Sequence, residues 1–117
     1  MDRPNFRTTL HIGNFLYVDE SPLVGVSKNL PYAKMVHLKD FYIRHADPGE
    51  GWFRSAYGTY LRGTILGHGD INVREVLQIM KTQEYKGYVS LEFEGMEGPE
   101  QGVRIGLANA KRLWDEI

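Results

Sequence analysis

Residues 33–40, AKMVHLKD, form an apolar-rich run that ends abruptly in a histidine, a lysine and an aspartate. Two further stretches have the same form, residues 8–14 (TTLHIGN) and residues 88–95 (YVSLEFEG). A buried strand that delivers polar side chains to its carboxyl end has this pattern. If the three strands are parallel, their carboxyl ends meet at one rim of the sheet. We expect three side chains to converge there: His11, His37 and Glu92.

Three helices are predicted between and after these strands, because apolar residues recur there at intervals of three and four. Their bounds follow from capping residues and prolines: from Ser21-Pro22 to Pro31, from Asp70 or Asn72 to about Thr82, and from Pro99 nearly to Ile117. The apolar positions are, in order, Leu23, Val26 and Leu30; Val73, Val76, Leu77 and Met80; Val103, Leu107, Ala110 and Trp114.

A long excursion, residues 40–70, interrupts this alternation. A loop of such length within a compact domain is usually functional or mobile, and a surface elaboration without a ligand role is the alternative. Residues 59–66 have strand-like composition, and we expect them to lie across the mouth of the site. Three arginines of this segment could contact a phosphate group or simply be solvated charges: Arg44, Arg54 and Arg62.

The composition limits the classes of function. The chain has 117 residues, 42% of them hydrophobic, which fits one globular domain over residues 1–117. Its formal net charge of -1 gives no long-range attraction to nucleic acid, so no nucleic-acid partner is expected. Because there is no cysteine, any metal would be held by histidine and carboxylate side chains.

No segment suggests a membrane partner or export. No apolar run approaches the roughly 20 residues that a membrane span needs. The first seven residues, MDRPNFR, lack the apolar centre of a signal peptide. A cytoplasmic location is the default expectation.

Strands that alternate with helices favour parallel pairing through right-handed crossovers, which defines an α/β fold. Three such units amount to about three eighths of a (β/α)8 TIM barrel. A parallel sheet of three strands with helices on one face leaves its other face and its edges uncovered. We therefore expect a partial barrel that forms a homo-oligomer or pairs with a missing N-terminal barrel part.

The order of the motifs HIGN, VHLKD, ILGHGDINVREVL and GYVSLEFEG resembles the C-terminal part of sugar phosphate isomerase/epimerase proteins of the xylose isomerase-like TIM barrel superfamily. The resemblance covers essentially the whole chain. It implies that the chain corresponds to strands six, seven and eight with their helices, and that the first five units lie outside it.

The resemblance also implies a divalent metal (Mn, Mg, Co or Zn) and a sugar or sugar phosphate substrate. Such proteins bind the metal through a glutamate on strand five, an aspartate on strand six, a histidine on strand seven and a glutamate on strand eight. His37 matches that histidine and Glu92 the last glutamate, which is also the expected catalytic residue. His11 stands where many members have aspartate, and on its own stretch a solvated or structural histidine is the commoner role. The expected substrate contacts are Asn14, Lys39, Asp40 and Arg44.

Three functions remain open at this level. The first is the C-terminal part of a metal-dependent sugar isomerase or epimerase, incomplete alone because the strand-five glutamate has no counterpart here. The second is a non-enzymatic oligomeric module that retains the fold segment. The third, an endonuclease-like zinc site, is less favoured, because a further DxH ligand pair is not evident after HLKD and the chain is not basic.

Overall fold

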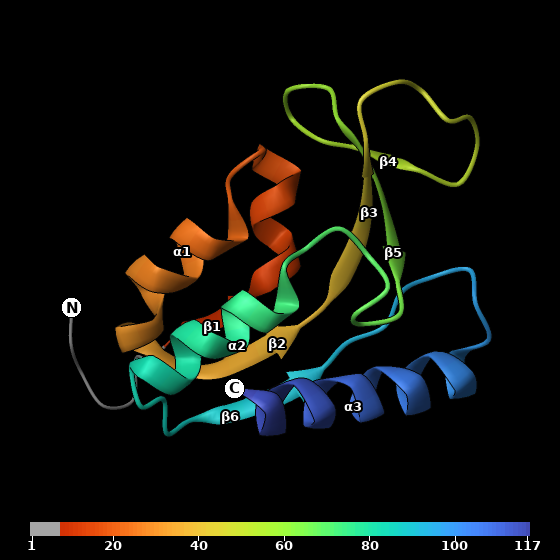
Figure 1. The fold of residues 1–117 in the computed structure, drawn as a ribbon. Coiled ribbons are helices and arrows are strands. Elements are labelled where there is room, and N and C mark those ends of the chain that lie inside the picture. The colour runs from red at the N-terminus through yellow and green to blue at the C-terminus, as the bar shows by residue number, and fades with distance from the viewer. Residues whose placement is uncertain (1–7) are drawn as a thin grey trace.

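The computed structural model describes residues 8–117, and a sheet of three parallel strands forms its centre (Figure 1). The strands are β1 (Thr8–His11), β2 (Ala33–Leu38) and β6 (Tyr88–Leu91), in the order β1-β2-β6. The parallel pairing expected from the sequence is confirmed. The prediction about a signal peptide concerns residues 1–7, which lie outside the described residues.

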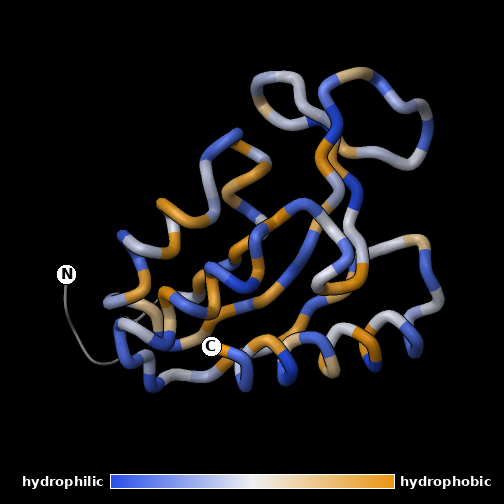
Figure 2. Tube along the Cα trace, viewed as in Figure 1, coloured by the Kyte–Doolittle hydropathy of each residue, from blue (hydrophilic) through white to orange (hydrophobic). Residues whose placement is uncertain are grey.

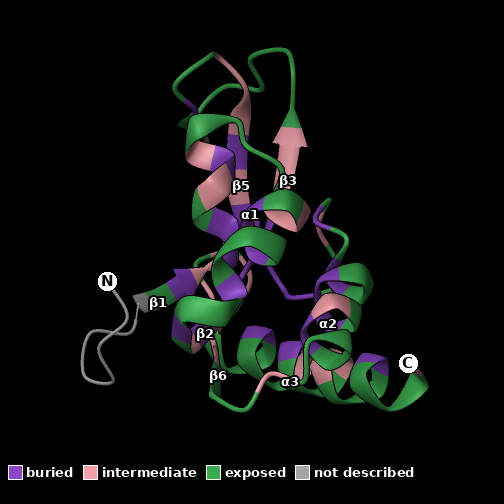
Figure 3. Ribbon diagram, turned by 90° about the vertical axis from the view of Figure 1, so that its left-hand side faces the viewer, coloured by how far each residue is buried: buried purple, intermediate pink, exposed green. Residues whose placement is uncertain are grey.

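Helices cover one side of this sheet, as the side view in Figure 3 shows. They are α1 (Pro22–Asn29), α2 (Val73–Thr82) and α3 (Pro99–Glu116), close to the predicted bounds. Side chains of β2 alternate between the two faces: Val36 and Leu38 are buried against the helices, while Met35 and His37 are half-buried on the other face. The apolar core thus lies between the sheet and the helices.

Two short 3-10 helices connect these elements. The first, η1 (Ile12–Val18), follows β1 directly. The second, η2 (Leu30–Tyr32), leads from α1 into β2. Together with α1 they give regular structure to most of the crossover between β1 and β2.

The excursion over residues 40–70 contains a second sheet, which corrects the expectation of a long loop. Its strands β3 (Asp40–Arg44), β4 (Phe53–Arg54) and β5 (Tyr60–Thr64) are antiparallel in the order β3-β5-β4. The strand character expected for residues 59–66 is confirmed by β5. Strand β3 was missed because a buried aspartate begins it and an exposed arginine ends it.

The second sheet extends from the carboxyl end of β2, where β3 begins, and it packs against η1 (Figure 1). Its apolar side packs through Phe41, whose ring meets the ring of Tyr17 edge-on at 5.7 Å. On the opposite flank, Gly63 bridges to Gly95, and the hydroxyl of Thr64 donates to Glu97 at 2.5 Å. The second sheet is therefore fastened to the segments that follow both β1 and β6.

The apolar stripe from which α3 was predicted, Val103, Leu107, Ala110 and Trp114, is not the buried side of this helix. Its buried residues are Gly102, Gly106 and Leu113. The stripe instead stays partly in contact with solvent, and Figure 2 shows hydrophobic residues recurring along this helix. The exposed members of the stripe are Val103 (40%), Leu107 (44%) and Trp114 (38%).

Among residues 8–117, no helix has the length and apolar character required to cross a membrane.

Candidate metal centre

The three side chains expected to converge lie together at the carboxyl ends of the parallel strands. His11 is the last residue of β1 and is paired in register with His37 of β2. Glu92 follows β6 directly, and its backbone N–H donates to the carbonyl oxygen of Leu38 at 2.9 Å. The register of the sheet therefore brings two imidazoles and one carboxylate to the same rim.

The cluster is compact and partly open to solvent. His11 Nδ1 lies 3.5 Å from Glu92 Oε1, and His37 Nδ1 is in direct contact with the same oxygen. The two imidazole rings meet edge-on with centroids 4.4 Å apart. The side chains of His11, His37 and Glu92 are 38%, 23% and 31% exposed, so solvent and small solutes reach them.

This donor set fits a divalent cation. One ligand atom from each of His11, His37 and Glu92 lies within 4.8 Å of the other two. Two ligands bonded to one ion at about 2.0–2.2 Å must lie within about 4.4 Å of each other, so modest side-chain rotation suffices. Imidazole and carboxylate ligands suit zinc, manganese and cobalt better than calcium.

Lys39 and Glu94 form a second cross-strand pair beside the cluster. Lys39 Nζ donates to Glu94 Oε1 at 2.7 Å, and the lysine side chain is only 9% exposed. A buried ammonium group requires such a partner, because its desolvation is costly. This pair was not predicted from the sequence. The available signal was the matched spacing, since Lys39 stands two residues after His37 and Glu94 two residues after Glu92.

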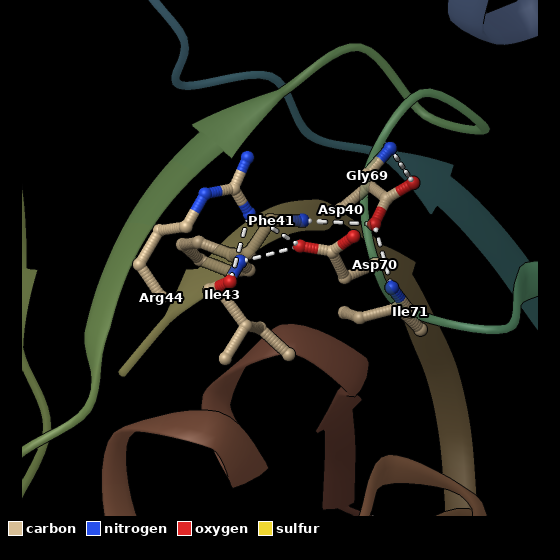
Figure 4. A network of polar contacts seen from close by, with 7 residues as sticks. All are labelled: Asp40, Phe41, Ile43, Arg44, Gly69, Asp70 and Ile71. Atoms are coloured by element: carbon tan, nitrogen blue, oxygen red, sulfur yellow. Dashed lines mark hydrogen bonds and ion pairs between the residues drawn. The ribbon is translucent and has the colours of Figure 1, made fainter. Parts of the chain in front are cut away.

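Asp40 is completely buried, and its carboxylate forms hydrogen bonds with residues 67–71, the segment that leads into α2 (Figure 4). Its two carboxylate oxygens accept four backbone N–H groups at 2.9–3.3 Å. The expected substrate contact is not supported, since no carboxylate surface is left for a ligand. The donors belong to Phe41, Gly67, Gly69 and Ile71.

This environment predicts an unusual pH dependence. Burial raises the pKa of Asp40 above its ordinary value of 3.8, against the opposing effect of the backbone hydrogen bonds. A carboxyl group with a raised folded-state pKa stabilises the fold most when protonated, and this contribution is lost as the pH rises through that pKa. Urea unfolding at a series of pH values should therefore show the wild type losing stability relative to Asp40→Asn above about pH 4. If the wild type instead gained stability relative to Asp40→Asn above that pH, the raised pKa of Asp40 would be contradicted.

The two remaining predicted contacts lie outside the cluster. Asn14 is exposed on η1, three residues after His11. Arg44 ends β3, where its guanidinium pairs with Asp70 at 3.2 Å and lies over the ring of Trp52. Figure 4 shows Arg44 turned toward Asp70 on the side of the second sheet.

Comparison with known proteins agrees with this architecture. Parallel strands with helices on one face and polar side chains at their carboxyl ends are features of (β/α)-barrel proteins. The model of the xylose isomerase-like TIM barrel family matches residues 1–113, and the chain belongs to that family.

A xylose isomerase domain protein from Planctomyces limnophilus has a similar fold, with a TM-score of 0.73 and 20% sequence identity. The match covers 99% of this chain and 38% of that chain, so this chain spans well under half the length of that protein. A search of curated proteins found no match.

Proposed function

We propose that this chain is the metal-binding C-terminal part, strands six to eight, of a sugar or sugar phosphate isomerase or epimerase. One observation carries the proposal: His11, His37 and Glu92 form a compact donor set at the carboxyl rim of a parallel sheet. In barrel enzymes that rim is where active sites lie. Membership of the xylose isomerase-like family supports the same reaction class.

Each group has a distinct part in this proposal. His11 and His37 would hold the cation as neutral imidazoles, with Glu92 as the charged ligand. The cation that these three residues would hold would supply Lewis-acid chemistry, which would make the C–H group beside a sugar carbonyl more acidic. Glu92 would accept or return the proton at that carbon, as a positioned carboxylate can.

The chain supplies only part of such a site. Moving a proton between two carbons or two faces is aided by a second carboxylate, and the expected strand-five glutamate has no counterpart among these 117 residues. That group would come from outside this chain. Asn14, Lys39 and Arg44 are the proposed substrate contacts. Ion pairing does not separate them, because Lys39 pairs with Glu94 just as Arg44 pairs with Asp70.

Metal titration tests the proposed site. Isothermal titration of the purified chain with Mn²⁺ or Zn²⁺ should show saturable binding of one ion. Loss of a residue that hydrogen-bonds to a metal ligand costs metal sites about 10–100-fold in affinity, so removal of a direct ligand in His37→Ala should cost about 100-fold or more. His45→Ala is the matched control, because His45 is exposed and lies outside the cluster. Equal affinities in all three proteins would refute the metal site.

Sugar binding is tested separately through the paramagnetism of Mn²⁺. The C–H signals of a ketose or ketose phosphate should broaden in the presence of the Mn²⁺-loaded chain and not with His37→Ala. Tight Mn²⁺ binding without selective broadening of any sugar would retain the metal site and refute the sugar substrate.

A further inference from the structure

One face of the second sheet carries three arginines. Arg44 of β3 and Arg54 of β4 both stand opposite Tyr60 of β5. Two residues away on these strands, Arg62 of β5 stands opposite Tyr42 of β3. Residues paired across an antiparallel sheet, and residues two apart along one strand, project to the same side. The three guanidinium groups therefore share one side of the sheet, whereas the side of the intervening residues packs against η1.

Two of these arginines stack on the same pair of aromatic rings. The guanidinium carbon of Arg62 lies 5.2 Å from the ring centre of Tyr42 and 4.9 Å from that of Trp52. For Arg44 the two distances are 5.5 and 5.7 Å. A guanidinium group stacked on a ring keeps its N–H groups, which point outward in its own plane, available for a ligand. Tyr42, Arg44, Trp52 and Arg62 form what we name the arginine–aromatic cluster.

The positive charge on this face exceeds the negative charge that is paired with it. Arg44 pairs with Asp70 at 3.2 Å, but neither Arg54 nor Arg62 forms an ion pair with any of residues 8–117. The Arg62 guanidinium donates to Met96 Sδ at 3.7 Å, and a thioether sulfur is a weak acceptor. In the described part of the chain no buried side-chain nitrogen lacks a partner, so the unpaired N–H groups of Arg62 reach solvent.

Segments of this chain border the cluster on both flanks. Asp70 stands just before α2, and Met96 and Glu97 stand between β6 and α3. Glu97 lies near Arg62, but its carboxylate accepts the hydrogen bond of the Thr64 hydroxyl. The second sheet lies between β2 and β6 in the sequence, and those two strands pair with each other. The exposure of this face therefore does not arise from the open edges of the parallel sheet.

We propose that the arginine–aromatic cluster binds the phosphate group of a small phosphorylated molecule. A phosphate monoester carries a charge of about −1.5 to −2 at neutral pH and three strong acceptor oxygens. Two guanidinium groups held on one pair of rings match it with parallel N–H donors, and Arg54 adds a third positive charge on the same face. This inference goes beyond the proposed function and does not rest on it, because no metal ligand takes part.

The chemistry favours a small anion over a polymer. A nucleic acid is bound through many phosphate contacts along an extended basic surface, whereas the formal net charge of this chain is -1. The positive charge is concentrated on one face of a short sheet, which suits a single phosphate group. Its source is either free phosphate or a phosphorylated metabolite such as a sugar phosphate, and both present the same oxygens to the cluster.

Trp52 provides a reporter for this binding. The chain has two tryptophans, so Trp114→Phe leaves Trp52 as the only one. In this background, with EDTA present and ionic strength held constant, inorganic phosphate should change the tryptophan emission saturably. Arg62→Gln should weaken the affinity about tenfold or more, because charge-assisted hydrogen bonds are lost. Arg74→Gln is the matched control: it removes the same charge from an exposed arginine of α2, which pairs with Glu116, and should leave the affinity unchanged.

A second variant separates recognition of the phosphate from support of the fold. Circular dichroism checks that each variant is folded, and Arg62→Lys decides the case if Arg62→Gln does not fold. Lysine keeps the charge but lacks the planar fork, so phosphate should still bind more weakly than to the wild type. No phosphate-dependent emission, full affinity in the folded Arg62 variants, or an equal loss in Arg74→Gln would overturn the proposal.

Two further arms separate the cluster from the metal centre and identify the source of the phosphate. His37→Ala should bind phosphate as the wild type does, and loss of binding in this variant would move the phosphate to the metal centre and overturn the proposal while leaving the proposed function intact. The same titration with a ketose phosphate compares the two sources. Tighter binding than inorganic phosphate would identify a sugar phosphate as the ligand, and equal affinity would identify free phosphate; either result supports the site.

Discussion

Replacing Asp40 with alanine is expected to lower the free energy of unfolding by about 3–5 kcal/mol, because several buried backbone donors lose their only acceptor. The carboxylate is inaccessible to solvent and accepts four backbone N–H groups from β3 and from residues 67–71. Alanine would leave those donors without acceptors in a small cavity. Each unsatisfied buried donor costs about 1–3 kcal/mol, although water entering the cavity would offset part of the loss.

Urea unfolding monitored by circular dichroism measures this effect. Asp47→Ala is the appropriate control, because Asp47 is exposed and accepts a single backbone N–H, from Gly49 at 2.8 Å. Its cost should be about 1 kcal/mol or less. Comparable losses in the two variants would mean that the network around Asp40 does not hold the entry to α2 in place.

Substituting valine for Gly63 should destabilise the protein by about 3 kcal/mol or more, at the upper end of overpacking effects. A Cβ atom at Gly63 would collide with the backbone carbonyl oxygen of Glu94. Backbone cannot move aside as a flexible side chain can, so the bridge between Gly63 and Gly95 has to open. The melting temperature should fall by on the order of 10 °C.

Gly98→Val provides the comparison for this substitution, since nothing lies within 4 Å of a Cβ atom at Gly98. Gly98 precedes α3 with an ordinary negative φ, so valine should cost less than about 1 kcal/mol there. Thermal unfolding of the two variants side by side separates a local clash from a general intolerance of larger residues. Equal melting temperatures would refute the close approach of the two backbones.

The parallel sheet and its helices could be predicted because local patterns and long-range packing agree in these elements. The stripe of Val73, Val76, Leu77 and Met80 is buried as its spacing requires. The apolar run before His37 is a buried strand for the same reason. The convergence of His11, His37 and Glu92 follows from the parallel pairing of the three strands alone.

Of the second sheet only β5 could be predicted, because the burial of the other strands depends on partners far along the chain. Phe41 and Ile43 alternate with polar residues in β3, but their burial comes from β5 and η1. Asp40 illustrates the same limit at the site. A polar residue after a strand suggests a ligand contact, and only the position of residues 67–71 shows that its carboxylate is used internally.

The middle strand of the parallel sheet has a consequence for synthesis on the ribosome. His37 and Glu92 are 55 residues apart, so β2 lacks one neighbour until most of the chain has emerged. Closing a loop of that length costs about 3–4 kcal/mol of chain entropy, to be recovered only when β6 docks. The candidate metal centre is therefore among the last features to assemble, and a bound cation would favour the completed state over its precursors.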